Sequence, residues 1–174
     1  MELYYDDHVF YRALLNEYIA IDRGEGVYLY DTDGRRYLDA CGQGAGCIIS
    51  IGYGVQEVVE AMAAQASRIS ILHGGLFRSE AFVELAERVV EMAPAGLTRV
   101  WLSSGGSEAV ESALKLARQY HVGKGNGSKY RFIGRWLSFH GATMATIAMT
   151  GLPGSRAGFE PLLQDFPHIV PCYC

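Results

Sequence analysis

Residues 100–118 read Val100-Trp-Leu-Ser-Ser-Gly-Gly-Ser-Glu-Ala-Val-Glu-Ser-Ala-Leu-Lys-Leu-Ala-Arg118 and carry the clearest secondary-structure signals of the sequence. Its first three residues are typical of a buried strand. Gly105 and Gly106 carry no side chains at the point where the backbone must turn sharply. From Ser107 onward, apolar residues recur at three- and four-residue steps, which is the period of an amphipathic helix. The stretch therefore predicts a strand, a tight turn and a helix.

This turn is suited to bind an anion. The start of a helix exposes unpaired N–H groups and the positive end of the helix dipole, and glycine lets an anion approach the bare backbone. The alternative is an ordinary tight turn with Ser107 as a helix cap. The common nucleotide-binding motifs do not fit, because Gly125 follows the only Gly-Lys step and Cys47 occupies the third glycine position of a dinucleotide motif.

The composition is that of a soluble α/β protein. The 174 residues carry a net charge of −4, which argues against nucleic-acid binding. The sequence has no apolar run of membrane-spanning length, and its acidic start differs from a signal peptide, so we expect a cytoplasmic protein without a membrane partner. The cysteine pairs Cys41/Cys47 and Cys172/Cys174 do not form a zinc framework, so we expect reduced thiols and no metal site.

The order of expected elements indicates the fold class. We expect a β-hairpin over residues 24–40 and a helix or turn starting at Gly141. The other expected elements are helices near 8–18, 55–68, 79–92 and 106–121, and strands near 98–102 and 130–136. From residue 55 onward, helices alternate with strands, which predicts crossover units on a mainly parallel sheet.

Residues 104–118 resemble the cofactor-phosphate segment of the class III aminotransferases, which use pyridoxal 5′-phosphate (PLP). Four further segments resemble the same family in the same order: 24–39, 51–65, 77–88 and 138–143. The resemblance spans residues 23–173 and implies the N-terminal part of a PLP-dependent transferase of fold type I. It places an N-terminal arm and hairpin of the small domain at 1–50, and the first part of the large PLP-binding domain at 51–174.

The same resemblance implies a cofactor site. Gly106 and Ser107 match the family's phosphate contacts through backbone N–H groups and the Ser107 hydroxyl. Phe139 matches the aromatic residue that stacks on the pyridine ring, where the family often has tyrosine. His140 follows it and is expected among the cofactor-binding residues, where it orients this loop or packs beneath it rather than acting as a general base. Glu108 is expected either to favour the helix dipole or to make a hydrogen bond in the site.

No catalytic residue is assigned, because the family's Schiff-base lysine and the acidic partner of the ring nitrogen have no counterpart in this sequence. Its only lysines are Lys115, Lys124 and Lys129, and none is at the family's position. The chain resembles the first part of a longer protein, so we expect it to be inactive by itself. Arg78 and Arg156 could bind a substrate carboxylate, but nothing in the sequence selects them.

The implied reaction is transamination between an amino acid or amine and a keto acid, in a homodimer. The apolar residues expected at the subunit contact are Tyr4, Tyr5, Phe10, Tyr11, Leu14 and Leu15. Two alternatives remain: a non-transaminating PLP enzyme of the same fold, such as an aminomutase or racemase, or a truncated remnant without catalysis. The sequence does not identify the amino donor or the acceptor.

Overall fold

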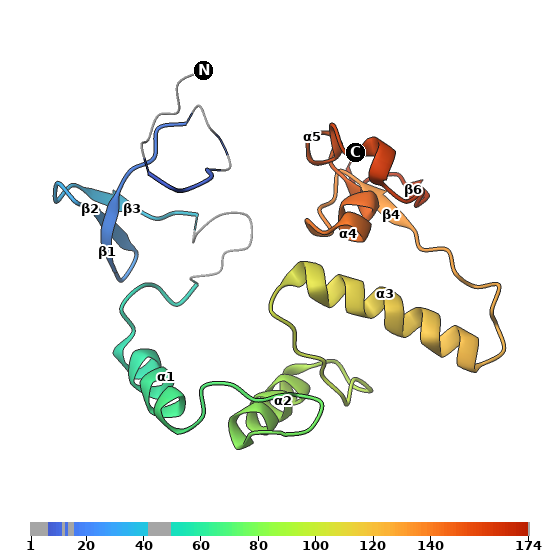
Figure 1. The fold of residues 1–174 in the computed structure, drawn as a ribbon, viewed down its shortest axis with the longest axis horizontal. Coiled ribbons are helices and arrows are strands. Elements are labelled where there is room, and N and C mark those ends of the chain that lie inside the picture. Colours follow the sequence, from blue (N-terminus) through green and yellow to red (C-terminus); the bar gives the residue numbers. More distant parts are fainter. Residues whose placement is uncertain (1–6, 12, 14–15, 42–49, 174) are drawn as a thin grey trace. The chain divides into compact units, whose positions relative to one another are not determined.

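The computed structural model describes residues 7–11, 13, 16–41 and 50–173. The chain forms two compact units, Met1–Arg78 and Ser79–Cys174. The first unit contains an antiparallel sheet and one helix, and the second contains the remaining elements (Figure 1). The domain boundary expected at residue 50 refers to the domains of a longer protein, and it stays a prediction.

The first unit is built on an antiparallel sheet in the order β1-β2-β3. The strands are β1 (Ile21–Glu25), β2 (Tyr28–Asp31) and β3 (Arg36–Leu38). The predicted hairpin over residues 24–40 is confirmed in β2 and β3. Strand β1 was not predicted, because its sequence Ile-Asp-Arg-Gly-Glu lacks the apolar alternation of a half-buried strand.

Asp31 holds the turn between β2 and β3. Its Oδ1 accepts hydrogen bonds from the backbone N–H groups of Asp33 (3.0 Å) and Arg35 (2.8 Å), while its Oδ2 accepts one from the Tyr37 hydroxyl (2.8 Å). Gly34 completes the turn at φ 82°, a conformation that glycine adopts without strain. The Tyr37 hydrogen bond, helped by the two backbone N–H groups, lowers the pKa of Asp31 below its ordinary value of 3.8, although burial opposes this effect.

We expect the stability of this hairpin to fall in acid. A carboxyl group whose pKa is lowered by folding stabilises the folded state above its unfolded pKa, and this contribution is lost as the pH falls through the lower, folded pKa. The free energy of unfolding of the wild-type chain should therefore decrease between about pH 5 and about pH 3. Asp31→Asn should flatten this decrease, and Asp33→Asn, which changes an exposed carboxylate in the same turn, should not. Urea unfolding followed by tyrosine fluorescence measures the slopes. Equal slopes for wild type and Asp31→Asn would contradict the assignment.

The helix expected near residues 8–18 is wrong for the described residues of that range, which are not helical. Side-chain hydrogen bonds replace the helical pattern there: Asp7 accepts from the Val9 backbone N–H (2.9 Å) and from the Tyr11 hydroxyl (2.6 Å). The rings of Tyr11 and Tyr18 lie 4.4 Å apart. Short polar side chains compete with helix formation in this way.

Of the apolar residues expected at a subunit contact, Phe10 is 91% exposed. Four others lie outside the described residues: Tyr4, Tyr5, Leu14 and Leu15.

The helices expected near 55–68 and 79–92 are confirmed as α1 (Gln56–Arg68) and α2 (Glu80–Met92). The Ser79 hydroxyl caps α2 by accepting a hydrogen bond from the Phe82 backbone N–H (3.2 Å). Helix α2 ends two residues before Pro94, as the stop signal predicts. Both helices form from local signals in the sequence.

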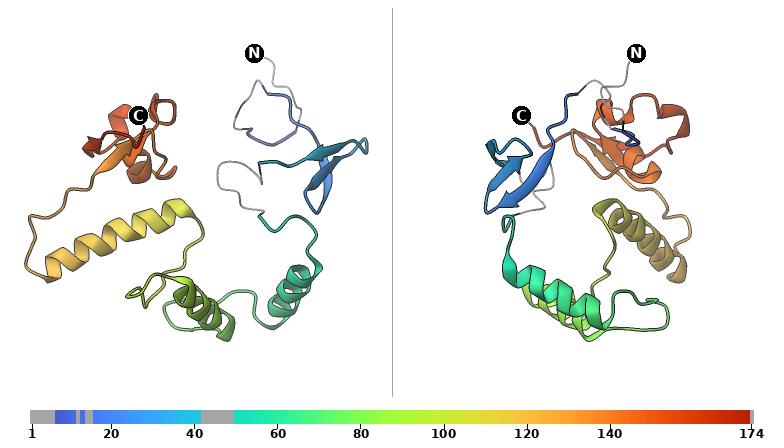
Figure 2. Two further views of the ribbon diagram at one scale, coloured as in Figure 1. Left: turned by 180° about the vertical axis from the view of Figure 1, so that it is seen from behind. Right: turned by 60° about the vertical axis from the view of Figure 1, so that its left-hand side comes forward.

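The second unit contains a parallel sheet in the order β5-β4-β6. Its strands are β4 (Gly134–Trp136), β5 (Thr150–Gly151) and β6 (His168–Ile169). Helix α4 (Met144–Met149) leads directly into β5 and begins three residues after Gly141. Figure 2 shows α4 beside this sheet in both views. Two shorter helices, α5 (Pro153–Arg156) and the 3₁₀ helix η1 (Glu160–Leu162), precede β6. The expectation of an α/β protein with a mainly parallel sheet is confirmed.

Buried side chains of the second unit gather on α4 and the start of β5. Thr146, Ala148 and Thr150 are fully buried, and Met149 is nearly so. The predicted helix over 106–121 is confirmed as α3 (Gly106–Gly123), which runs two residues further. Helix α3 contacts α4, so the small core lies beside the helix that carries the predicted phosphate-binding residues Gly106 and Ser107.

The strand expected near residues 98–102 does not form. A strand exists through hydrogen bonds to a neighbouring strand, and no described segment pairs with these residues. Trp101 is accordingly 76% exposed. The strand expected near 130–136 is shortened to β4 for the same reason, since β5 and β6 are each two residues long.

Two further findings concern the described part of the chain. None of its helices combines the length and apolar character that a membrane-spanning helix requires. Cys41 and Cys172 are exposed free thiols. Cys47, Cys174 and the glycine-rich residues 42–46 lie outside the described ranges.

Candidate functional site

The start of α3 is open to solvent. Gly105 and Gly106 are exposed, and a Cβ atom placed on Gly106 would meet no atom within 4 Å. The first N–H groups of a helix have no acceptor within the helix itself, so they are available to an external anion. Glu108 lies in this first turn, with Oε2 2.8 Å from the position of a Cβ on Gly105. Its carboxylate therefore lies beside the turn, on the Gly105 side.

Ser107 joins this helix start to a segment 35 residues further along the chain. Its Oγ accepts a hydrogen bond from the backbone N–H of Ala142 (2.9 Å). Because this contact uses a lone pair of the hydroxyl, the Ser107 proton remains available to donate. The structure thus brings together two sequence segments, 104–107 and 138–143, that were selected separately.

Phe139 follows the carboxyl end of β4, where ligands bind in parallel α/β sheets. Its side chain is 61% exposed, so its ring offers a flat apolar face. His140 turns back toward the sheet: its Nε2 accepts from the Arg135 backbone N–H (3.4 Å), and its backbone N–H donates to Thr150 Oγ1 (3.0 Å). The predicted roles of both residues toward a cofactor stay predictions.

Sequence reasoning missed the side chains that hold residues 139–143. Thr143 Oγ1 donates to Glu111 Oε1 (2.6 Å), and Thr146 Oγ1 accepts from the Thr143 backbone N–H (2.9 Å). The spacing of Thr143 and Thr146 is that of a helix-capping pair, a signal the sequence does contain. The contact of Glu111 with Thr143 has no such signal, because the two residues are 32 positions apart.

The model of the aminotransferase class-III family matches residues 10–173. This chain belongs to the class III aminotransferases. It is 42% identical over 143 residues to a probable aminotransferase of Mycobacterium tuberculosis, covering 82% of this chain and 30% of that protein. It is 36% identical over 156 residues to the putrescine–pyruvate aminotransferase of Pseudomonas aeruginosa, covering 88% of this chain and 33% of that protein. The chain therefore spans about a third of the length of these curated relatives.

Solved transaminase structures share the fold of this class III aminotransferase chain. The ω-transaminase of Pseudomonas jessenii in complex with PMP superposes with a TM-score of 0.84 at 31% identity, covering 96% of this chain and 37% of that chain. A thermostable variant, engineered for the asymmetric synthesis of bulky amines, gives a TM-score of 0.83. The architecture is that of the first part of a fold-type-I PLP-dependent transferase, and PLP is the cofactor of this family.

The residues at the α3 start of this class III aminotransferase chain fit a phosphate group. Gly106 leaves open space beside free helix N–H groups, and the hydroxyl of Ser107 is oriented by Ala142 so that its proton can be donated. Phe139 belongs to the segment that this hydrogen bond holds. The assignment of these residues to the phosphate and the ring of PLP stays a prediction.

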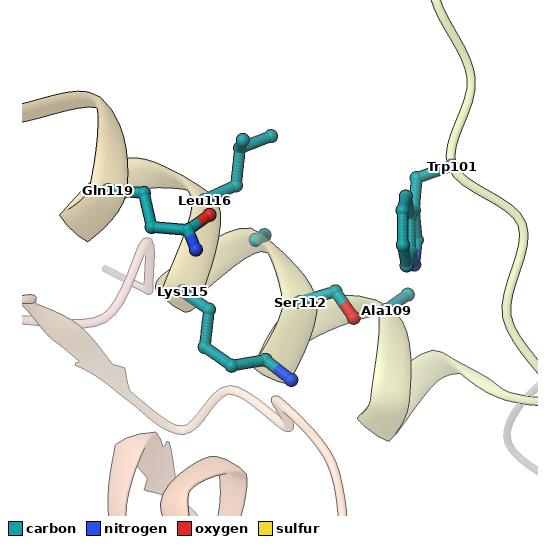
Figure 3. Close-up of a pocket in the computed structure, with 7 residues that line it drawn as sticks. Trp101, Ala109, Ser112, Lys115, Leu116 and Gln119 are labelled. Atoms are coloured by element: carbon teal, nitrogen blue, oxygen red, sulfur yellow. The ribbon is translucent and has the colours of Figure 1, made fainter. Parts of the chain in front are cut away.

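Lys115 lies on the flank of α3, away from the helix start. It contributes to a pocket of about 380 Å³ whose other lining residues include Trp101, Ala109, Ser112, Leu116 and Gln119. Figure 3 shows the Trp101 ring facing Ala109, and the Lys115 amine reaching back along the helix toward Ser112. Lys124 and Lys129 lie at and beyond the other end of α3. Lys115 therefore lies on the flank of α3 and not at the N-terminus of this helix.

Arg78 and Arg156, which could bind a substrate carboxylate, differ in their surroundings. Arg156 donates from Nη1 to the carbonyl oxygens of Ile147 (3.2 Å), Ala148 (2.6 Å) and Thr150 (3.1 Å). These bonds engage carbonyl groups at the end of α4 and at the start of β5, so Arg156 has a structural role there. Arg78 is exposed at the end of the first unit.

Proposed function

We propose that this chain is the N-terminal part of a PLP-dependent aminotransferase that moves an amino group between an amino acid or amine and a keto acid. The family membership supports the reaction class. The observation that carries the proposal is the hydrogen bond from Ala142 to Ser107, because it unites the phosphate-binding turn with the Phe139 segment.

Each residue of the site has a distinct task in this proposal. Bound PLP supplies an electron sink and carries the amino group between donor and acceptor. The N–H groups of Gly106 and Ser107, with the Ser107 hydroxyl, bind the phosphate and so fix the position of the cofactor. Phe139 covers one face of the ring and excludes water from it. His140 holds the loop through its bonds to Arg135 and Thr150.

We further propose that the lysine and the ring-nitrogen partner come from a segment beyond these residues, and that the assembled enzyme is a homodimer. This chain covers only 30% and 33% of the length of the two relatives, which supports a lysine and a ring-nitrogen partner outside these residues. The second statement follows from the family resemblance, and Phe10, which is expected at the subunit contact, is 91% exposed. The names of the relatives differ in substrate, so donor and acceptor are not proposed.

Ser107→Ala is expected to weaken binding of pyridoxamine 5′-phosphate to this chain by about tenfold, because a hydrogen bond to a charged group contributes about 1.5 kcal/mol or more. This ligand carries the phosphate and ring of the cofactor but has no aldehyde, so it cannot react with lysines. Isothermal titration measures its affinity, and pyridoxamine, which lacks the phosphate, serves as the comparison ligand.

The matched control is Ser112→Ala, which removes a hydroxyl from the flank of the same helix. Its affinity for pyridoxamine 5′-phosphate should equal that of the wild type. The proposal fails if the wild type does not prefer pyridoxamine 5′-phosphate over pyridoxamine, or if Ser107→Ala binds both ligands as the wild type does.

A further inference from the structure

Three hydroxyl groups hold the loop of residues 139–143 by its backbone. Thr150 Oγ1 accepts from the N–H of His140 (3.0 Å), Ser107 Oγ from that of Ala142 (2.9 Å), and Thr146 Oγ1 from that of Thr143 (2.9 Å). Thr146 and Thr150 are fully buried. Buried hydroxyls of β-branched side chains have few alternative rotamers, so the loop has little freedom on this side.

The loop and α3 approach each other too closely at Gly141 to accept a side chain. A Cβ on Gly141 would lie 2.5 Å from Thr146 Oγ1 and 2.8 Å from Ser107 Oγ. Gly141 also has φ 137°, which disfavours other residues. Gly141 therefore allows the loop backbone to lie close to both Thr146 and Ser107.

Glu111 provides a second attachment of the loop to α3. It lies one helical turn beyond Ser107 and thus on the same face of the helix. Its Oε1 accepts the proton of Thr143 Oγ1 at 2.6 Å, a distance typical of hydrogen bonds to a carboxylate. An ionised carboxylate can only accept, so the Thr143 proton must point to Glu111. The Thr143 oxygen then faces Thr146 Oγ1, 2.8 Å away, as an acceptor.

We infer that Glu111 is a positioning residue for the cofactor phosphate, an inference that rests on the function proposed above. Through Thr143, Glu111 holds the Gly141–Ala142 backbone against α3. The Ala142 N–H then occupies a lone pair of Ser107 and leaves the Ser107 proton directed to the anion. Without Glu111, Thr143 loses its strongest partner and the Ser107 hydroxyl is free to rotate. Affinity for the phosphorylated ligand then falls further than affinity for the ligand without a phosphate.

The first test measures binding of pyridoxamine 5′-phosphate and of pyridoxamine to the unmodified chain and to five variants. Glu111→Ala and the isosteric Thr143→Val are each expected to lower affinity for the phosphorylated ligand about fivefold, within the range of coupling through one hydrogen-bond network. The double variant should lose no more than either single one, because both break the same bond. Thr143→Ser, which keeps the hydroxyl, should bind as the wild type does. Glu87→Gln, an exposed carboxylate on α2, is the control and should change nothing.

The second test separates positioning from general stabilisation. Amide hydrogen exchange of the ligand-free chain should be faster in Glu111→Ala at residues 139–143, and unchanged in α2 and in the C-terminal half of α3. Exchange that accelerates throughout the second unit, with unaltered affinity for pyridoxamine 5′-phosphate, would show a purely structural role and overturn the inference.

The result for Ser107→Ala separates the positioning role of Glu111 from the proposed function of the chain. If the wild type prefers the phosphorylated ligand and Ser107→Ala loses this preference while Glu111→Ala keeps it, the positioning role is refuted and the proposed function stands. If the wild type shows no preference for the phosphorylated ligand, both are refuted.

Discussion

Gly141→Ala should destabilise the second unit by about 2–5 kcal/mol, because overpacking costs about 1–3 kcal/mol and a left-handed backbone conformation about 1–2 kcal/mol more. The added methyl group would contact Thr146 and Ser107 at once, at 2.5 Å and 2.8 Å. Neither neighbour can move freely, since Thr146 is fully buried and Ser107 is bonded to Ala142. Binding of pyridoxamine 5′-phosphate should be lost with the stability.

Urea unfolding followed by tryptophan fluorescence measures this effect, because both tryptophans, Trp101 and Trp136, belong to the second unit. Gly154→Ala is the matched control: it makes the same change in α5, where the new Cβ would meet no atom within 4 Å. Its effect should lie within about 0.5 kcal/mol of zero. Equal midpoints for the two variants would show that the close approach at Gly141 is not a constraint in solution.

Elements that depend on local signals could be predicted from the sequence. Helices α1, α2 and α3 follow apolar periodicity and end at residues with recognisable stop signals. The hairpin of β2 and β3 follows from the Asp31–Gly34 turn, where the hydrogen bonds that the Asp31 carboxylate accepts all lie within six residues. The strand expected near 98–102 and the helix expected near 8–18 could not be predicted correctly in this way. Residues 98–102 need a neighbouring strand, and Asp7 makes side-chain contacts with Val9 and Tyr11 that compete with a helix.

The candidate site shows the same division between local and distant contacts. Gly106 and Ser107 were predicted because a helix start has a recognisable composition and because their segment resembles the family's phosphate segment. Phe139 and His140 were found through the family resemblance, since an aromatic residue beside a histidine has no local signature of its own. Glu111 and Thr143 were missed. Glu111 reads as one more polar residue on an amphipathic helix, and only the folded chain brings it to Thr143.

The largest effect is expected for catalysis itself: the 174-residue chain should show no amino transfer above the rate of free PLP. Schiff-base catalysis needs a lysine amine at the cofactor aldehyde. Lys115 is eight residues beyond Ser107, roughly 12 Å along the helix axis, and its amine lies on the flank of α3. Lys124 and Lys129 are further from the helix start along the chain. The chain should still bind the phosphate group, because those contacts do not need a lysine.

Borohydride reduction in the presence of PLP, followed by peptide mapping, tests this geometry directly. We expect substoichiometric labelling spread over Lys115, Lys124 and Lys129, and a parallel assay with several amino donors and pyruvate should detect no turnover. The putrescine–pyruvate aminotransferase of Pseudomonas aeruginosa, a relative of about three times this length, is the positive control for the assay. A single dominant labelled lysine together with multiple turnovers would mean that this chain carries its own catalytic amine. The division of labour proposed here, with phosphate and ring binding in these residues and proton transfer in a segment beyond them, would then be wrong.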